Sequence, residues 1–244
     1  MQRTKRFLSW GAGLVAIATI MGGCLKTNNT PPEPSWAVKL MHMAPTSPAA
    51  DLYFNGTKAS SNAIGYNTAP SGYTQNLKVN DIVITYKKGG SDSVIAEIDR
   101  LKYDTSQFYT LLLYSLPDGS ARAARISDLA PENGGGAGKA YYRFWNLSDA
   151  GAVDFYIGTN KVEFDRTLAD NVVSGGGSNY FNRFQPVNAD DYTLYVKEAG
   201  TENVLAKFEN VSMPQNTITT FFLKGKKGNT GIYELGIGAT RNSF

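Results

Sequence analysis

Residues 80–114 read NDIVITYKKGGSDSVIAEIDRLKYDTSQFYTLLLY, and residues 190–224 read DDYTLYVKEAGTENVLAKFENVSMPQNTITTFFLK. The two segments align without a gap at an offset of 110 residues, and each alternates apolar and polar residues around a glycine turn. An internal repeat of this size predicts two tandem domains rather than a stack of short solenoid units. The identical pairs are Asp81/Asp191, Lys87/Lys197, Gly90/Gly200, Val94/Val204, Ala96/Ala206, Thr110/Thr220 and Leu113/Leu223.

The repeat extends toward the N-terminus of each segment. Residues 143–148 align with residues 39–44, and residues 153–157 align with residues 50–54, at offsets of 103 to 104. The second copy therefore has about seven additional residues, and we expect them in the glycine-rich run Val173–Ser178.

Short apolar–polar alternations, separated by turn residues, fill the first copy. No apolar pattern of helical period and length follows residue 24. The sequence therefore predicts an all-β protein with two tandem immunoglobulin-like antiparallel β-sandwich domains. We expect strands at residues 37–43, 51–54, 73–77, 81–87, 94–98, 107–115 and 121–126.

The N-terminal segment has the layout of a secretory signal. Basic residues precede the apolar run Trp10–Cys24, which is too short for a comfortable membrane span. The run ends with Met21, Gly22, Gly23 and Cys24, which resembles the bacterial lipoprotein box, and Cys24 is the only cysteine. The resemblance implies a signal peptidase cut before Cys24 and acylation of Cys24, with palmitate as an expected acyl group.

Acylation at Cys24 predicts that the membrane is a partner of this protein. Two or three acyl chains make release from a bilayer very slow. We therefore expect a lipid-anchored protein of the bacterial outer membrane, on its periplasmic face or at the cell surface. Two alternatives stay open, namely a buried structural cysteine beside a conventional signal, or an N-terminal helix as the anchor. A lone cysteine excludes an intrachain disulfide.

Composition and charge divide the chain further. The formal net charge of +3 lies entirely in the predicted signal, so the remaining chain is neutral and lacks the basic surface that nucleic acids require. A polar, proline-bearing stretch follows Cys24 and is typical of a flexible tether. The predicted parts are 1–23 signal peptide, 24–36 lipidated cysteine and flexible tether, 37–129 first β-sandwich domain, 130–139 Gly-rich linker, and 140–244 second β-sandwich domain.

Residues 39–56, KLMHMAPTSPAADLYFNG, resemble the opening of the domain-of-unknown-function 4397 (DUF4397) family. The resemblance implies an immunoglobulin-like sandwich in an exported, often lipid-anchored protein, and it implies no known activity. In the second copy Asn146 replaces His42, while Asp154 and Tyr156 remain. The matching residues of the first copy are His42, Pro45, Pro48, Asp51, Tyr53 and Gly56, whereas Met43, Ala44 and Thr46 depart from the pattern.

The single histidine raises the question of a reactive site. His42 and Asp51 fit either a catalytic or metal-binding pair, or a strand-end imidazole that holds the following turn and a turn-capping carboxylate. No second histidine or thiol is available for zinc, and Asn146 in the second copy cannot do the same chemistry. We therefore expect structural roles for His42, Asp51 and Asp154, with no catalytic residue, no metal and no cofactor.

The densest aromatic run is Tyr141-Tyr142-Arg143-Phe144-Trp145. Alternate residues of a strand face opposite sides, so about half of this run is expected to be exposed. Tyr141, Tyr142 and Trp145 are therefore candidates to face a ligand, and core packing is the alternative.

These observations predict a non-catalytic lipoprotein of the cell envelope that acts in binding, adhesion or assembly at the outer membrane. The alternative is a carbohydrate-binding accessory lipoprotein of a glycan-uptake system. The expected partner is a glycan or an envelope protein.

Overall fold

The computed structural model describes residues 36–77, 81–102, 107–131, 136–162 and 182–243. The predicted signal, the lipidation site Cys24 with Met21, Gly22 and Gly23, and the loop Val173–Ser178 lie outside these residues. Within the described part of the chain, no helix has the length and apolar character needed to cross a membrane.

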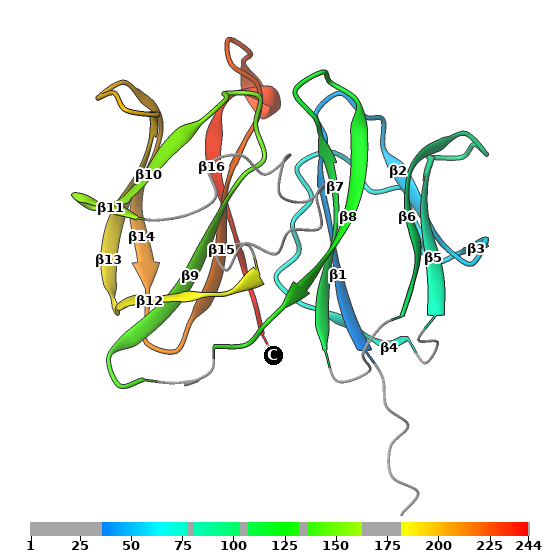
Figure 1. The fold of residues 1–244 in the computed structure, drawn as a ribbon, viewed down its shortest axis with the longest axis horizontal. Helices are drawn as coiled ribbons and strands as arrows, with labels where there is room; N and C mark the ends of the chain where they lie inside the picture. The colour runs from blue at the N-terminus through cyan, green and yellow to red at the C-terminus, as the bar shows by residue number, and fades with distance from the viewer. Residues whose placement is uncertain (1–35, 78–80, 103–106, 132–135, 163–181, 244) are drawn as a thin grey trace, which may run out of the picture. The chain divides into compact units, whose positions relative to one another are not determined.

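Residues 36–128 form a first sandwich of two four-stranded sheets (Figure 1). The sheet orders are β4-β1-β7-β8 and β3-β2-β5-β6. The strands start and end close to the bounds that the turn residues predict. They are β1 (Trp36–Met43), β2 (Ala50–Phe54), β3 (Thr57–Lys58), β4 (Thr74–Leu77), β5 (Asp81–Lys88), β6 (Val94–Lys102), β7 (Phe108–Ser115) and β8 (Ala121–Asp128).

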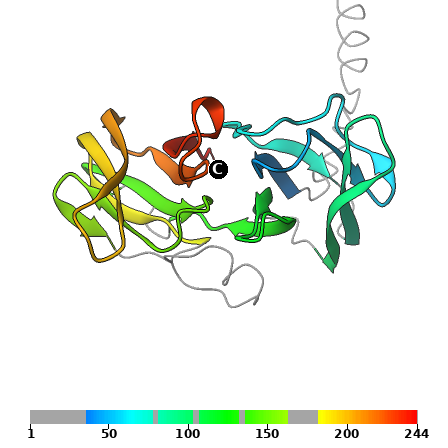
Figure 2. The same ribbon diagram turned by 90° about the horizontal axis from the view of Figure 1, so that it is seen from above.

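The described residues between 139 and 241 form a second sandwich (Figure 2), and its strand order repeats that of the first. Its sheets are β12-β9-β15-β16 and β11-β10-β13-β14, so each strand has its counterpart eight strands earlier. The immunoglobulin-like all-β class is confirmed. The elements are β9 (Lys139–Asn146), β10 (Val153–Ile157), β11 (Asn160–Val162), β12 (Gln185–Asn188), β13 (Asp190–Glu198), β14 (Val204–Met213), β15 (Ile218–Lys224), the 3-10 helix η1 (Gly231–Tyr233) and β16 (Gly236–Arg241).

One pairing in each sandwich departs from the predicted antiparallel arrangement. β1 pairs in parallel with β7, and β9 pairs in parallel with β15. The chain leaves the sheet after β1 and builds β2 and β3 in the opposite sheet. It returns through β4 and, after β5 and β6, enters β7 in the direction of β1. The other pairings are antiparallel, as predicted.

Each sandwich has its own core between its two sheets. Trp36, Ile84 and Leu111 are fully buried in the first core, and Phe155 and Leu194 are fully buried in the second. Trp36 was expected in the flexible tether, and this expectation is wrong because the residue begins β1 and packs edge-on against Tyr109. The indole therefore fixes the point at which the N-terminal segment joins the first sandwich.

A third apolar cluster contains residues of both sandwiches. β1 and β9 are buried on both faces, because one face of each strand lines its own core and the other face contributes to this cluster. All described residues belong to one compact unit. The cluster consists of Met41, Met43, Leu112, Tyr114, Ala124 and Ile126 from the first sandwich, with Trp145, Leu147 and Phe222 from the second.

Candidate functional site

His42 is the last-but-one residue of β1, and both of its ring nitrogens bind backbone groups. Nδ1 accepts a hydrogen bond from Ala44 N–H at 3.3 Å, and Nε2 lies 3.1 Å from the carbonyl oxygen of Pro48. Acceptance at Nδ1 leaves Nε2 as the donor, so the imidazole is neutral in its Nε2–H tautomer. Burial lowers the pKa of His42 below its ordinary value of 6.5. The histidine therefore holds the turn that follows β1.

Asn146 makes the same pattern of bonds in the second sandwich. Its Oδ1 accepts a hydrogen bond from Ser148 N–H at 3.2 Å, and its Nδ2 donates to the carbonyl of Gly151 at 2.7 Å. An amide can replace an imidazole here because each side chain offers one acceptor and one donor on neighbouring atoms. The predicted structural role of His42 agrees with this geometry.

Asp51 and Asp154 are turn-capping carboxylates with matching partners. Asp51 Oδ2 accepts from Gly90 N–H at 3.1 Å and pairs with Lys58 Nζ at 2.8 Å. Asp154 Oδ2 accepts from Gly200 N–H at 2.9 Å and pairs with Lys161 Nζ at 2.8 Å. The hydrogen bond from Lys58 lowers the pKa of Asp51. Each carboxylate thus joins two hairpins of one sheet.

The remaining residues of the family pattern are also used structurally. Lys87 Nζ lies 4.5 Å from the centre of the Tyr53 ring, and Lys197 Nζ lies 4.6 Å from the centre of the Tyr156 ring. Gly56 has φ of +79°, which a hairpin turn requires and which other residues adopt only with strain. No group of three or more histidine, cysteine, aspartate or glutamate residues suited to a metal occurs among the residues that the structure describes.

A buried polar cluster joins the two sandwiches. Arg143 Nη2 donates to Asp128 Oδ1 at 2.5 Å, and both side chains are fully buried. Asp128 Oδ2 also accepts from the hydroxyl of Thr110 at 2.6 Å, while Arg143 Nε donates to the hydroxyl of Thr220 at 2.9 Å. The identical pair Thr110/Thr220 of the sequence repeat therefore lies in this cluster.

Lys39 occupies in β1 the place that Arg143 occupies in β9. It is opposite Thr110 in the sheet, as Arg143 is opposite Thr220. Lys39 Nζ donates to Asn242 Oδ1, directly after β16. Asp128, the partner of Arg143, ends β8, so each of the two cations binds a residue at the end of the last strand of the other sandwich. Burial is the main cause that lowers the pKa of Lys39 from 10.5 to about 7.

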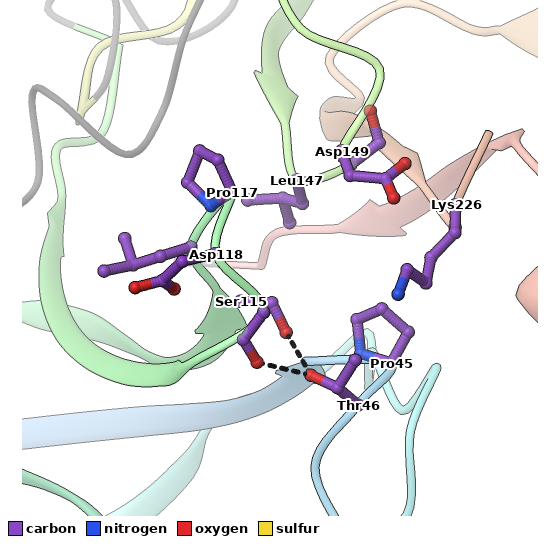
Figure 3. Close-up of a pocket in the computed structure, with 12 residues that line it drawn as sticks. Pro45, Thr46, Ser115, Pro117, Asp118, Leu147, Asp149 and Lys226 are labelled. Atoms are coloured by element: carbon purple, nitrogen blue, oxygen red, sulfur yellow. Dashed lines mark hydrogen bonds between the residues drawn. The ribbon is translucent and has the colours of Figure 1, made fainter.

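Four connections meet at one pocket, beyond the C-terminal ends of the strands that they follow. They are the loops after β1, β7, β9 and β15, and the cavity volume is about 130 Å³. Figure 3 shows Asp149 and Lys226 of the second sandwich on one side of the pocket, with Ser115 and Asp118 of the first on the other. The lining is completed by Pro45, Thr46, Leu116, Pro117, Gly119, Leu147, Ser148 and Gly225.

The polar groups of the pocket are held in place by backbone bonds. The Thr46 hydroxyl donates to the carbonyl of Gly119 at 2.7 Å and lies 3.1 Å from Ser115 Oγ (Figure 3). Asp149 Oδ1 accepts from Lys227 N–H at 2.7 Å, and Asp118 Oδ1 accepts from Ser120 N–H at 2.8 Å. A backbone amide thereby orients each carboxylate, and a hydrogen bond from the Ser120 side chain is the main cause that lowers the pKa of Asp118.

The connection from β15 to β16 is a shaped excursion rather than a tight turn. At Gly225, φ is +95°, and an added Cβ would lie 2.0 Å from the carbonyl oxygen of Glu234. Lys226 N–H donates to the carbonyl of Tyr233 at 2.8 Å. The Tyr233 ring stacks on Tyr66 of the first sandwich, with ring centroids 5.2 Å apart and planes 11° apart. This excursion places Lys226 in the pocket.

Sequence reasoning singled out Pro45 but not the rest of this pocket. The glycine and proline turns that form it are visible in the sequence, yet each alone predicts only a turn. Their convergence depends on the parallel pairings of β1 with β7 and of β9 with β15, which local patterns do not encode. The pairing of Arg143 with Asp128 was missed for the same reason.

Residues 37–156 match the family model described as domain of unknown function (DUF4397). This stretch belongs to the DUF4397 family. The DUF4397 match covers the first sandwich, continues through β9 and ends within β10. Its first part contains the six residues that carried the resemblance.

Comparisons outside the DUF4397 family add little. No curated protein matches this chain. A solved structure described as "Alpha-glucan binding by a streptococcal virulence factor" aligns over 82% of this chain and 96% of that chain, with 13% identity and a TM-score of 0.26. A TM-score this low supports no inference about fold or ligand.

The expectation that Tyr141, Tyr142 and Trp145 face a ligand is wrong. Tyr141 is 7% exposed, Tyr142 is 5% exposed and Trp145 is 1% exposed. Tyr142 packs into the second core, while Trp145 belongs to the cluster shared by the sandwiches and lies 4.2 Å from the Arg143 guanidinium. Both faces of β9 are covered, so the alternation of a strand does not expose half of its aromatic residues here.

Proposed function

We propose that this protein is a non-catalytic binding protein of the bacterial cell envelope, held at the outer membrane by a lipid on Cys24. Its partner, an envelope protein or a glycan, binds at the pocket formed by the four converging loops. The observation that carries this proposal is that loops of both sandwiches build one pocket with oriented polar groups.

The use of the titratable groups supports a binding role rather than catalysis. A general base or nucleophile must reach substrate with a free pair of electrons. His42 has both ring nitrogens engaged by backbone, and it is 1% exposed. Asp51 and Asp154 each bind a lysine and a glycine amide. The pocket carboxylates, Asp118 and Asp149, are exposed, and no histidine lines the pocket.

The direction of β1 supports a binding site at the opposite end of the first sandwich from the point where the N-terminal segment joins it. β1 runs from Trp36, where the N-terminal segment joins, to Met43, and the pocket residues Pro45 and Thr46 follow directly. Eight strand residues span about 25 Å. An anchor on Cys24 therefore pulls on one end of the first sandwich, while the pocket lies at the other end.

Photocrosslinking in intact cells tests this proposal. A photoreactive residue at Pro117 reports on the pocket, and one at Gln215, in the turn before β15, reports on the opposite end of the second sandwich. We expect adducts with an envelope component from position 117 and not from position 215. A Cys24→Ser variant is expected to leave the membrane fraction. Equal yields from both positions would contradict binding at the pocket.

A further inference from the structure

The polar groups around the pocket include negatively charged hydrogen-bond acceptors and one positively charged hydrogen-bond donor. Asp118 and Asp149 supply carboxylate oxygens, and Lys226 supplies an ammonium group. Within the described residues Lys226 Nζ has no ion-pair partner, and the ion pair of this excursion is made by its neighbour Lys227, with Glu198 at 3.4 Å. The pocket therefore offers both kinds of hydrogen-bonding group to a ligand.

These groups select against simple charged or apolar ligands. An anionic group meets repulsion from two carboxylates. A cationic group can pair with a carboxylate but leaves the Lys226 ammonium without an acceptor. An apolar side chain would remove water from three charged groups without replacing their hydrogen bonds, which is unfavourable. A hydroxyl group both donates and accepts, so a cluster of hydroxyls can satisfy the carboxylates and the ammonium group together.

The size and the walls of the pocket limit the ligand further. A volume of about 130 Å³ is less than half of the roughly 300 Å³ at which pockets for drug-sized molecules begin. Pro45, Pro117 and Leu147 provide rigid apolar walls between the polar groups. Such a site fits one ring with apolar faces and polar edges.

We infer that the pocket binds a neutral polyhydroxylated ring, namely a single sugar residue at the end or branch of a glycan. This inference rests on the proposed binding function and names its ligand class. The hydroxyls of the sugar donate to Asp118 and Asp149 and accept from Lys226. The carbon faces of the sugar lie against the prolines and Leu147.

The pocket is preorganised for such a ligand. Backbone amides fix one oxygen of each carboxylate, and Gly225 allows the close approach of Glu234 that shapes the excursion carrying Lys226. Preorganised polar groups lose little conformational entropy when the ligand arrives, so weakly bound sugars gain affinity. Two isosteric changes, Asp118→Asn and Asp149→Asn, keep the acceptor oxygen that binds the backbone amide and remove the charge.

The experiment uses the full lipidated protein in detergent micelles, first on a glycan array and then by titration of the bound glycans. We expect binding of a set of glycans that share one terminal or branching sugar. Lys226→Ala and Asp149→Asn are expected to lower the affinity by about tenfold or more, since each removes a charge-assisted hydrogen bond. Lys227→Ala removes an adjacent side chain that does not line the pocket and keeps the backbone amide that holds Asp149, so it is the matched control and leaves the affinity unchanged.

Other outcomes separate the ligand class from the binding function. Glycan binding that resists both pocket variants would overturn the assignment of the sugar to this pocket. Failure to bind any glycan, while crosslinks from position 117 persist and depend on Lys226, would overturn the sugar but keep the pocket as a protein-binding site. Absence of glycan binding together with absence of pocket-dependent crosslinks would overturn both.

Discussion

Arg143 of the second sandwich and Asp128 of the first form a hydrogen-bonded ion pair of 2.5 Å in which neither side chain is exposed. The guanidinium also lies between the rings of Trp145 and Phe184, at 4.2 and 4.4 Å from their centres. Charge neutralisation and cation–π contacts together offset the desolvation of the two ions. This pair makes the interface between the sandwiches specific in register.

Removal of one partner of this pair is predicted to destabilise the protein strongly. Asp128→Ala leaves Arg143 buried without its counter-ion, and we expect a loss of about 3–5 kcal/mol in the free energy of unfolding. Replacement of both ions by apolar residues, Asp128→Leu with Arg143→Met, is expected to come within about 2 kcal/mol of the wild type. Urea unfolding of Asp128→Leu, Arg143→Met and the variant with both changes measures the coupling. Additive losses would show that the ions do not act as a pair.

His42 is predicted to make stability fall in mild acid. Because burial lowers its pKa below 6.5 in the folded state, the unfolded chain binds the proton more readily. Stability is therefore complete above about pH 6.5 and decreases as the pH falls below that value. His42→Asn copies the bonds of Asn146, so it is expected to lose about 1 kcal/mol or less at pH 7 and to weaken this acid dependence.

His42→Phe is the control for this substitution, because it fills the space but provides neither bond. It is expected to lose more stability than His42→Asn, since Ala44 N–H and the Pro48 carbonyl lose their partners. Chemical denaturation between pH 5 and pH 8 checks both variants. An unchanged acid dependence in His42→Asn would assign it to other groups.

Deprotonation of Lys39 is predicted to make the free energy of unfolding depend on pH in the alkaline range. Its pKa is about 7 in the folded protein and 10.5 in its ordinary state, so the unfolded chain holds more protons between these values. Stability is expected to rise with pH from about 7 toward 10, above which buried tyrosines such as Tyr142, with a pKa raised to about 12, oppose the trend. Lys39→Met is expected to flatten this rise. A variant that keeps the full slope would contradict the assignment to Lys39.

The matched carboxylates Asp51 and Asp154 provide an internal control for each other. Asp51→Ala removes the acceptor of Gly90 N–H, so amide exchange at Gly90 is expected to accelerate while exchange at Gly200 does not change. Asp154→Ala is expected to have the opposite selectivity. Hydrogen exchange followed by NMR or mass spectrometry measures both. Protection that persists at Gly90 in Asp51→Ala would mean that the turn holds without this carboxylate.

Gly225 is predicted to be far less replaceable than Gly228. Both have positive φ, of +95° and +81°, but only Gly225 has a backbone oxygen within 4 Å of an added Cβ. Gly228→Ala is expected to cost about 1 kcal/mol, the ordinary penalty of positive φ for alanine. Gly225→Ala is expected to cost more and to disturb the stack of Tyr233 on Tyr66. Thermal unfolding and near-ultraviolet circular dichroism distinguish the two variants.

The strands and turns were predictable because their signals are local. Alternation around Gly90 and Gly200, and the Asn55-Gly56 turn, specify hairpins without reference to distant residues. The structural use of His42 was predictable because Asn146 stands at the same place and cannot perform the same chemistry.

The interface and the pocket were not predictable because they depend on pairings between distant strands. The same alternation that predicts a strand predicts exposure for half of its residues, and Trp145 violates this because a second sheet covers its face. Lys39 and Arg143 read as ordinary surface residues of strands, since their partners Asn242 and Asp128 are distant in the sequence. A sequence repeat indicates two similar domains, but it does not indicate which of their faces are buried against each other.

Binding at the loop-end pocket is measured by the crosslink yield from position 117 in intact cells, in the wild-type background and with Lys226→Ala or Lys227→Ala. We expect a strong adduct in the wild type and in Lys227→Ala, and loss of most of this adduct in Lys226→Ala. An adduct of equal yield in all three backgrounds, or none in any of them at normal protein level, would mean that no partner binds at this pocket.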